Sequence, residues 1–415
     1  MKRFVNRSSV EGTVRAPSSK SMMQRAVAIA SLGKSSCRLN GLSGCADLFA
    51  SIRAAEALGT KVELDGSSAL ITPRFRKASD TVDCGEAGLT VRMFAPIAAL
   101  QNHKFVFTGQ GSLLKRPIDM VEDALIKMGV SCSTQNGFLP MCIEGPVSNN
   151  EITVDGSVSS QLITGLLIAY AHCDKSSRII VNNLTSKPYI DMTIEILSHF
   201  GINIINKDYK VFEIEHGGRH DLEKYNVEGD WSGAAFIMVA AALAGTVTIN
   251  NLSSQSSQGD KEILTIIKNS GAQISENRDS ITVHRSILKP FNCDATDCPD
   301  LFPPLCALAA GCNGKSRISG IHRLAYKESD RAAVLIEQFK KIGVGIQIEG
   351  NDMIINGGQV AGGVAESCND HRIAMALAVA GLISDKGVTI ENAEAVQKSY
   401  PVFFEDLHDL GAEVQ

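Results

Sequence analysis

The sequence predicts an α/β protein of two similar domains, each built from three repeated units. Two repeated patterns and the chain length support this prediction. One pattern is a helix that ends at a glycine and precedes an alternating segment; the other is an apolar, alanine-rich helix. Each occurs six times in the 415 residues, and a chain of this length accommodates two or three domains.

The first pattern ends at glycines that lie 68 to 72 residues apart. A glycine directly after a helix readily adopts the positive φ that closes the last turn. An alternating segment such as Ala272–Ser275 follows five of the six helices, as expected of a half-buried strand. The six glycines are Gly59, Gly129, Gly201, Gly271, Gly343 and Gly411.

The second pattern is a helix that is apolar on nearly every face, and such a helix is buried. The six copies begin near Ser21, Gly88, Ser159, Trp231, Pro299 and Asp370. One unit therefore reads as strand, buried helix, strand, amphipathic helix and strand pair. A period of this length does not fit a doubly wound sheet or a solenoid. We expect one domain at 20–227 and the other at 1–19 plus 228–415, with an active site in the cleft between them.

The composition argues against several classes of protein. The net charge of −5 offers no overall positive field for nucleic acid. The eleven cysteines form no Cys-x-x-Cys pair, which indicates reduced thiols and a cytoplasmic protein. Residues 1–7 precede no apolar leader, and the longest apolar run, Ala234–Ala244, is too short to cross a membrane. The nine histidines show no metal-ligand spacing, so we expect neither a metal nor a cofactor.

Polar and charged side chains gather where the six buried helices begin. Ser18 and Ser19 precede one such helix as candidate N-caps, and Lys20 and Arg25 lie in its first turns. Free N–H groups and the helix dipole already favour an anion there, and cations strengthen the site. The corresponding residues at the other helices are Glu86 and Arg92; Ser159, Ser160 and Gln161; Asp230; Asp300; and Asp370, His371 and Arg372. Parallel helices would bring these ends together as a site for phosphates or carboxylates.

Seven motifs in order resemble the 5-enolpyruvylshikimate-3-phosphate (EPSP) synthase family of enolpyruvyl transferases. They are Ser19-Lys20-Ser21 with Arg25, Gly85–Gly88 with Arg92, Arg116-Pro117, Asp155–Gln161, Ser186–Asp191, Lys327–Arg331 and Asn369–Arg372. The resemblance covers essentially the whole chain. It implies two inside-out α/β domains, each with three repeated units, buried parallel helices and sheets outside.

The resemblance also implies a reaction and two substrates. The family transfers the enolpyruvyl group of phosphoenolpyruvate to the 5-hydroxyl of shikimate 3-phosphate and releases phosphate, on the shikimate pathway to chorismate and the aromatic amino acids. Shikimate 3-phosphate would be bound by Lys20, Ser21, Arg25, Ser159, Ser160, Gln161, Ser186, Asp300 and Lys327. Phosphoenolpyruvate would be bound by Lys20, Gly88, Arg116, Gln161, Glu328, Arg331, His371, Arg372 and Lys398. His371 has an equally weighted alternative role, the ordering of Arg372.

The reaction needs a base for the 5-hydroxyl and an acid for the methylene carbon. Asp300 suits the base, and Glu328 or Lys20 suits the acid. Cations and helix dipoles would stabilise the tetrahedral intermediate, so no metal is required. The family is usually monomeric and is the target of the herbicide glyphosate, and we expect both properties here.

Three positions depart from the family pattern. Ser18 stands in place of the usual Gly, Glu86 in place of a frequent Asn, and Leu89 in place of a common Thr. The Glu86 carboxylate could either repel an anionic substrate or pair with a neighbouring cation.

The sequence leaves two alternative functions to consider. The related transferase that acts on a UDP-amino sugar carries a reactive cysteine in the loop before Arg-Pro, whereas the loop Gly109–Lys115 has none. A non-catalytic anion-binding protein, or an RNA-end-processing relative, would not need Asp300 and Glu328 together.

Overall fold

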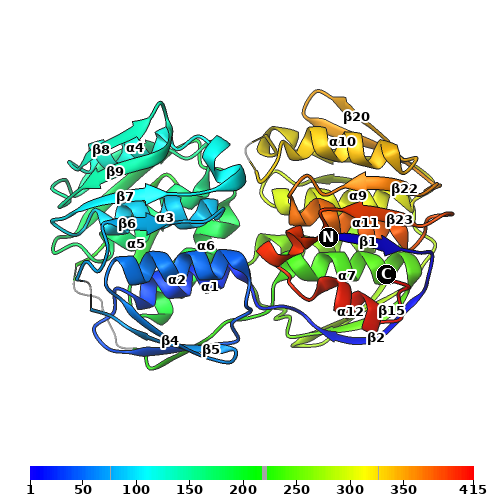
Figure 1. Ribbon diagram of the computed structural model, residues 1–415, viewed down its shortest axis with the longest axis horizontal. Helices are drawn as coiled ribbons and strands as arrows, with labels where there is room; N and C mark the ends of the chain where they lie inside the picture. The colour runs from blue at the N-terminus through cyan, green and yellow to red at the C-terminus, as the bar shows by residue number, and fades with distance from the viewer. Residues whose placement is uncertain (75, 217–221, 326) are drawn as a thin grey trace. The chain divides into compact units, whose positions relative to one another are not determined.

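The computed structural model describes residues 1–74, 76–216, 222–325 and 327–415, which form two compact units (Figure 1). The central unit is the continuous segment Lys20–Val227. The terminal unit combines Met1–Ser19 with Glu228–Gln415.

Three four-stranded sheets form the outer layer of the central unit. Each has one parallel pair of strands, followed by two antiparallel pairings. The strand orders are β14 (Lys224–Asn226)-β3 (Cys37–Asn40)-β5 (Ser68–Thr72)-β4 (Lys61–Asp65); β6 (Thr81–Asp83)-β7 (Lys104–Thr108)-β9 (Phe138–Glu144)-β8 (Ser131–Gln135); and β10 (Glu151–Asp155)-β11 (Ser177–Asn182)-β13 (Val211–Ile214)-β12 (Ile204–Lys207).

The terminal unit repeats this plan with two four-stranded sheets and one three-stranded sheet. The N-terminal segment supplies a strand to two of them: β2 pairs in parallel with β15, and β1 pairs antiparallel with β23. The strand orders are β16 (Gln273–Glu276)-β17 (Ser280–His284)-β15 (Gly245–Asn250)-β2 (Val10–Arg15); β18 (Asn292–Asp294)-β19 (Gly314–Ser319)-β21 (Asp352–Gly357)-β20 (Gly345–Glu349); and β1 (Lys2–Val5)-β23 (Val388–Glu391)-β22 (Gly363–Glu366).

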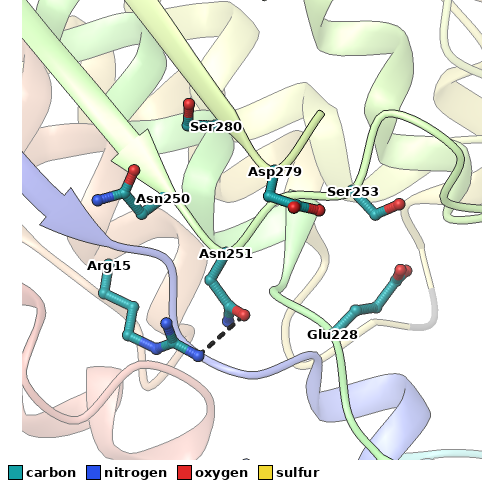
Figure 2. Close-up of a pocket in the computed structure, with 7 residues that line it drawn as sticks. All are labelled: Arg15, Glu228, Asn250, Asn251, Ser253, Asp279 and Ser280. Carbon is teal, nitrogen blue, oxygen red and sulfur yellow. Dashed lines mark hydrogen bonds between the residues drawn. The ribbon is translucent and has the colours of Figure 1, made fainter. Parts of the chain in front are cut away.

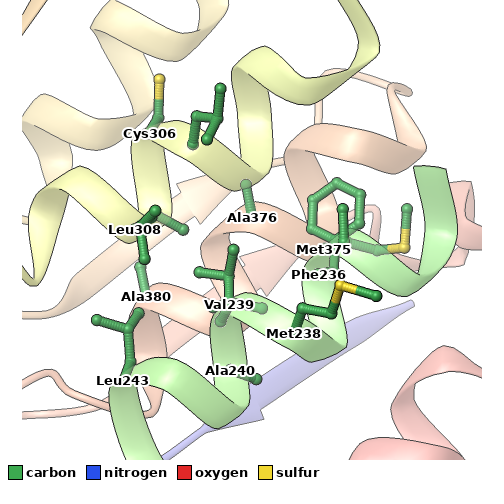
Figure 3. Close-up of a cluster of buried hydrophobic side chains, with 14 of the residues drawn as sticks. Phe236, Met238, Val239, Ala240, Leu243, Cys306, Leu308, Met375, Ala376 and Ala380 are labelled. Carbon is green, nitrogen blue, oxygen red and sulfur yellow. The ribbon is translucent and has the colours of Figure 1, made fainter. Parts of the chain in front are cut away.

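Six buried helices form the cores of the two units, as the alanine-rich pattern predicts. Every residue of α3, α7, α9 and α11 is buried, because sheets and neighbouring helices cover all their faces. In the terminal unit α7, α9 and α11 pack against one another through side chains such as Phe236, Leu308 and Met375 (Figure 3). The helices are α1 (Lys20–Ala30), α3 (Gly88–Ala98), α5 (Ser160–Tyr170), α7 (Trp231–Ala244), α9 (Phe302–Ala310) and α11 (His371–Gly381).

The glycine-terminated helices are also present, and their glycines have the predicted backbone conformation. All six glycines have φ between +71° and +106°. The helices are α2 (Ala46–Ala57), α4 (Asp119–Lys127), α6 (Lys187–His199), α8 (Ile263–Asn269), α10 (Arg331–Lys341) and α12 (Phe403–Asp409). Short 3₁₀ helices precede several elements: η1 (Gly111–Lys115), η2 (Gly259–Glu262), η3 (Pro299–Leu301), η4 (Ile321–Arg323) and η5 (Ala393–Lys398).

The eleven cysteines all lie in the described ranges, and they form no disulfide there. Met22 and Met23 lie in the core of the central unit. Across the described ranges, the helices are too short or too polar to cross a membrane.

Candidate active site

The predicted site residues fall into two sets, one in each unit. The terminal-unit set is centred on Asp300, which lies in η3 just before α9. Prolines at 299, 303 and 304 surround this start, where a missing N–H costs the helix little. The Asp300 carboxylate accepts hydrogen bonds from Lys327 Nζ at 3.3 Å, Arg331 Nη1 at 2.9 Å and Arg372 Nη2 at 2.9 Å. Three predicted cations therefore converge on the predicted base.

Arg331, the first residue of α10, connects Asp300 to two more carboxylates. Its Nη2 donates to Glu328 Oε2 at 2.5 Å, and its Nε donates to Asp370 Oδ2 at 3.0 Å. The Arg331 and Asp370 side chains are completely buried. Burial lowers the pKa of Arg331, but Asp370, Glu328 and Asp300 raise it, and the net pKa lies well above its ordinary value. This guanidinium is therefore a permanent charge.

Asp370 is the N-cap of α11 as well as the partner of Arg331. Its Oδ1 accepts from the backbone N–H of Arg372 at 3.0 Å. His371 is fully buried, with Nδ1 3.9 Å from Asp370 Oδ1. Lys398 Nζ donates to the Asn369 carbonyl at 2.7 Å, which brings the end of η5 to the same turn. The structure thus joins all seven predicted terminal-unit residues in one network.

Two other pKa shifts in this network follow from burial and nearby charges. Burial lowers the pKa of Lys327, although Asp300 opposes this. Burial also lowers the pKa of Arg372, but Asp300 and other carboxylates more than compensate, so its net pKa is raised. The two groups respond differently although both contact Asp300.

The central-unit set begins on α1. Lys20 Nζ forms an ion pair with Asp47 of α2 at 2.9 Å, and both side chains are mostly buried. Arg25 is 1% exposed and donates to the Ser21 carbonyl and to the hydroxyls of Thr164 and Thr193. Burial lowers the pKa of Arg25 to about 10, and Tyr189 opposes this shift. Arg25 therefore remains a cation at neutral pH, and its hydrogen-bond partners among the described residues are hydroxyl and carbonyl oxygens.

Gly88 and Arg116 lie in contact at the start of α3. A Cβ atom added to Gly88 would lie 2.6 Å from Arg116 Nη1, so a larger residue there would require the guanidinium to shift. Arg116 is 7% exposed, and its Nε is buried without a hydrogen-bond partner. Nearby, Arg92 Nη1 donates to Gln161 Oε1 at 2.9 Å, which orients the Gln161 amide. These contacts bring the starts of α3 and α5 together.

Three of the four predicted serines occupy two other helix starts. Ser159 caps α5 by accepting from the Gln161 backbone N–H at 3.2 Å. Ser160 is buried beside it. Ser186 precedes α6 in the left-handed region, with φ of 55°, and is also buried. Ser19 is a candidate N-cap in the sequence, but in the structure its hydroxyl donates to Gln258 Oε1 of the terminal unit.

Sequence reasoning missed two carboxylates that contact these residues or lie among their charges, Asp47 and Asp260, and it missed the partner of a third, Asp370. Asp47 pairs with Lys20. Asp370, which the sequence places at the start of a buried helix, pairs with Arg331. Asp260 is 4% exposed, accepts a hydrogen bond from the Ser232 hydroxyl and has its Oδ1 buried without a partner. Only Asp370 carried a signal in the sequence, namely its position before a buried helix.

A polar pocket of about 460 Å³ in the terminal unit lies apart from these residues (Figure 2). Arg15 Nη2 donates to Asn251 Oδ1 at 3.0 Å across its wall. The lining contains two carboxylates and one cation: Arg15, Glu228, Asn250, Asn251, Ser253, Asp279 and Ser280. This composition does not suit a polyanion. Among the described side chains, no group of three or more His, Cys, Asp or Glu residues is placed to hold a metal ion.

Solved structures similar to this chain define its fold. The EPSP synthase of Acinetobacter baumannii is 26% identical and superposes with a TM-score of 0.85, over 100% of this chain and 99% of that one. The enolpyruvyl transferase NikO of Streptomyces tendae is 16% identical, with a TM-score of 0.79 over 100% and 98% of the two chains. The fold is that of the enolpyruvyl transferases, which confirms the predicted fold class.

Sequence comparisons identify the family within this class. A family model described as EPSP synthase (3-phosphoshikimate 1-carboxyvinyltransferase) matches residues 5–407. The 3-phosphoshikimate 1-carboxyvinyltransferase of Clostridium novyi (strain NT) is 37% identical, over 97% of this chain and 96% of its own. That of Methanocella arvoryzae is 37% identical over 99% of both chains. The chain belongs to the EPSP synthase family.

We predict that Asp260 makes stability pH-dependent. Burial raises the pKa of Asp260 to about 7, and Asp300 adds to this, while Arg372 and the Ser232 hydroxyl oppose it. The folded chain then binds a proton that the unfolded chain releases above about pH 4. The free energy of unfolding contributed by this group is therefore greatest below that pH and falls as the pH rises to about 7.

Calorimetric melting of Asp260→Asn and wild type at about pH 5 and pH 8 measures this effect. The melting temperature of Asp260→Asn minus that of wild type should be larger at the higher pH than at the lower pH. Asp279→Asn, at an exposed carboxylate of the same unit, is the control. An equal difference between Asp260→Asn and wild type at both pH values would contradict the prediction.

Proposed function

We propose that this chain catalyses the reaction of its family. It transfers the enolpyruvyl group of phosphoenolpyruvate to the 5-hydroxyl of shikimate 3-phosphate and releases phosphate, through a tetrahedral intermediate. The observation that carries this proposal is the Asp300 network, in which one carboxylate at a helix start is held by three cations. A base among phosphate-binding cations is the combination that this reaction needs.

The two sets of residues are proposed to serve one active site between the units. Shikimate 3-phosphate is assigned to Lys20, Ser21, Arg25, Ser159, Ser160, Gln161, Ser186, Asp300 and Lys327. Phosphoenolpyruvate is assigned to Lys20, Gly88, Arg116, Gln161, Glu328, Arg331, His371, Arg372 and Lys398. The predominance of cations in the second set suits a ligand with one phosphate and one carboxylate.

In the proposed mechanism Asp300 takes the proton of the 5-hydroxyl as its oxygen attacks C2 of phosphoenolpyruvate. Glu328 and Lys20 are the candidate acids for the methylene carbon. Each is held by an ion pair, Glu328 with Arg331 and Lys20 with Asp47. The cations stabilise the charge that develops on the tetrahedral intermediate. The new methyl group then loses a proton as the C–O bond to phosphate breaks, which restores the enolpyruvyl double bond and releases phosphate.

Phosphate release in the presence of both substrates tests the function directly. Release should require phosphoenolpyruvate together with shikimate 3-phosphate. Release with a UDP-amino sugar instead would indicate the related transferase, and binding without release would indicate an anion-binding protein.

We also propose that the enzyme is a cytoplasmic monomer. The usual state of the family supports the monomer, and the free cysteines suit a reducing compartment. Light scattering from the purified chain measures its mass in solution, and a dimer mass would overturn the first part.

Replacement of Asp300 should separate binding from chemistry. Asp300→Ala should lose about 10²–10⁴ in turnover, the scale of a lost general base, and keep shikimate 3-phosphate binding within about tenfold. Because Ala leaves Arg372 without this carboxylate, Asp300→Asn is the matched variant that preserves shape. Turnover and direct binding are measured for both, and near-normal turnover of the Asn variant would remove Asp300 from the mechanism.

Gly88→Ala should weaken glyphosate more than phosphoenolpyruvate, because the inhibitor is the longer molecule and the added methyl displaces Arg116. We expect wild type to be sensitive. The inhibition constant of the variant should rise about tenfold to a hundredfold, as a clash of about 1–3 kcal/mol gives. Steady-state inhibition of both proteins decides this. Resistance of wild type to millimolar inhibitor, or equal sensitivity of the variant, contradicts it.

A further inference from the structure

Glu86 lies in the tight turn between β6 and α3, one of the positions where this chain departs from the family pattern. Its Oε2 accepts two hydrogen bonds from one residue of another loop, Ser112: one from the backbone N–H and one from the hydroxyl, each 3.0 Å long. Ser112 lies in η1, within the loop 109–116 that ends at Arg116. The carboxylate therefore contacts the segment that carries a proposed substrate-binding cation.

The sheet places the turn and the loop side by side. β6 and β7 are parallel neighbours, so both continue into loops at the same edge. The Cys84 N–H donates to the Thr108 carbonyl at 3.0 Å, and the Gln110 N–H donates to the Gly85 carbonyl at 2.8 Å. Backbone contacts thus hold the beginning of the loop, and Glu86 holds the next turn.

The carboxylate also fits closely against the loop backbone. Gly111 has φ of +56°, and a Cβ atom built on it would lie 2.4 Å from the carboxyl carbon of Glu86. The side chain thus occupies the space that any other residue at 111 would need. Two hydrogen bonds to a charged acceptor and this close packing fix the position of η1.

The end of the loop returns to the same turn. Leu113 is fully buried and accepts a hydrogen bond from the Arg116 N–H at 3.1 Å. The Arg116 guanidinium then lies against Gly88, two residues after Glu86. The turn and the first residue of α3 therefore contact the loop through the Gly85 carbonyl, the Glu86 carboxylate and Gly88.

We propose that Glu86 is a positioning residue that fixes the loop 109–116 through Ser112 and so holds the Arg116 guanidinium at Gly88, ready for the anionic substrate. The inference rests on the proposed role of Arg116 in phosphoenolpyruvate binding. The Oε2 atom of Glu86 accepts both hydrogen bonds from Ser112, so the carboxylate supports the loop that carries Arg116.

Length and charge of the side chain can be separated by two conservative variants. Glu86→Gln keeps the reach and an oxygen acceptor but removes the charge; Glu86→Asp keeps the charge and is one methylene shorter. The KM for phosphoenolpyruvate should stay within about threefold in Glu86→Gln. It should rise about tenfold in Glu86→Asp and Glu86→Ala, the loss expected when a binding group is misplaced. The KM for shikimate 3-phosphate should change less than about twofold in each.

Ser112→Ala and the double variant test the contact itself. Ser112→Ala removes the hydroxyl but keeps the backbone N–H, so its effect should be smaller than that of Glu86→Ala. If both act through one contact, Glu86→Ala/Ser112→Ala should be no worse than Glu86→Ala alone. Additive effects would overturn the inference.

Glu122 provides a matched control in the same unit. Its carboxylate accepts from the backbone N–H of Thr134 at 3.2 Å and from the Thr134 hydroxyl at 2.5 Å, the same chemistry away from Arg116. Glu122→Ala should leave the KM for phosphoenolpyruvate unchanged. If Glu122→Ala raises this KM as much as Glu86→Ala does, the inference is wrong. It is also wrong if Glu86→Gln is as impaired as Glu86→Ala while Glu86→Asp is normal, because the charge of the side chain and not its length would then be decisive.

Hydrogen exchange separates failure of the inference from failure of the proposed function, because it needs no substrate. Amides of the peptide 109–116 should exchange faster in Glu86→Ala than in wild type and Glu122→Ala. Unchanged exchange would overturn the loop contact even if wild type is active. If the peptide exchanges faster in Glu86→Ala but wild type shows no transferase activity, the loop contact is supported and its proposed purpose in substrate binding fails.

Discussion

The terminal-unit network depends on one constraint: a fully buried arginine must be surrounded by carboxylates. Arg331 has no exposed side-chain surface, and neither has its partner Asp370. An unpaired charge in such a place costs far more than a hydrogen bond returns, so neither group can be removed alone. Because Asp370 also caps α11, the start of that helix and the direction of Arg331 are set by the same carboxylate. The positions of Asp300, Glu328 and Arg372 follow from it.

The cations around Asp300 in the terminal unit and Arg25 in the central unit differ in the groups that surround them. In the terminal unit every cation that contacts Asp300 shares its charge with carboxylates. In the central unit Arg25 is equally buried, yet it contacts only hydroxyls and carbonyl oxygens. The first arrangement gives a rigid network with little free charge, and the second leaves a positive charge uncompensated. We therefore propose that a polyanionic substrate gains most from the second kind and is oriented by the first.

Local patterns in the sequence were sufficient to predict the repeated units and to identify the charged residues of the terminal-unit network. Gly343 and its five counterparts were predictable because one backbone conformation at a helix end requires glycine, and Lys327–Arg331 was predictable as a charged motif. Partners were not predictable where they come from distant elements. Asp47 is one acidic residue on an amphipathic helix and has no pattern that points to Lys20. The sequence placed Glu86 near the substrate, but its direction depends on how two loops meet at a sheet edge.

The N-terminal strands have a consequence for how the chain is made. Residues 2–5 pair with 388–391, and residues 10–15 pair with 245–250. On the ribosome the central unit is complete by Val227, while the first strands of the terminal unit still lack their neighbours. Such unpaired edges invite aggregation, and pairings this distant in sequence form slowly. The strand Val10–Arg15 has two buried positions and carries the charged residues Glu11 and Arg15. This polar composition favours solubility of the segment until its partner strand has been synthesised.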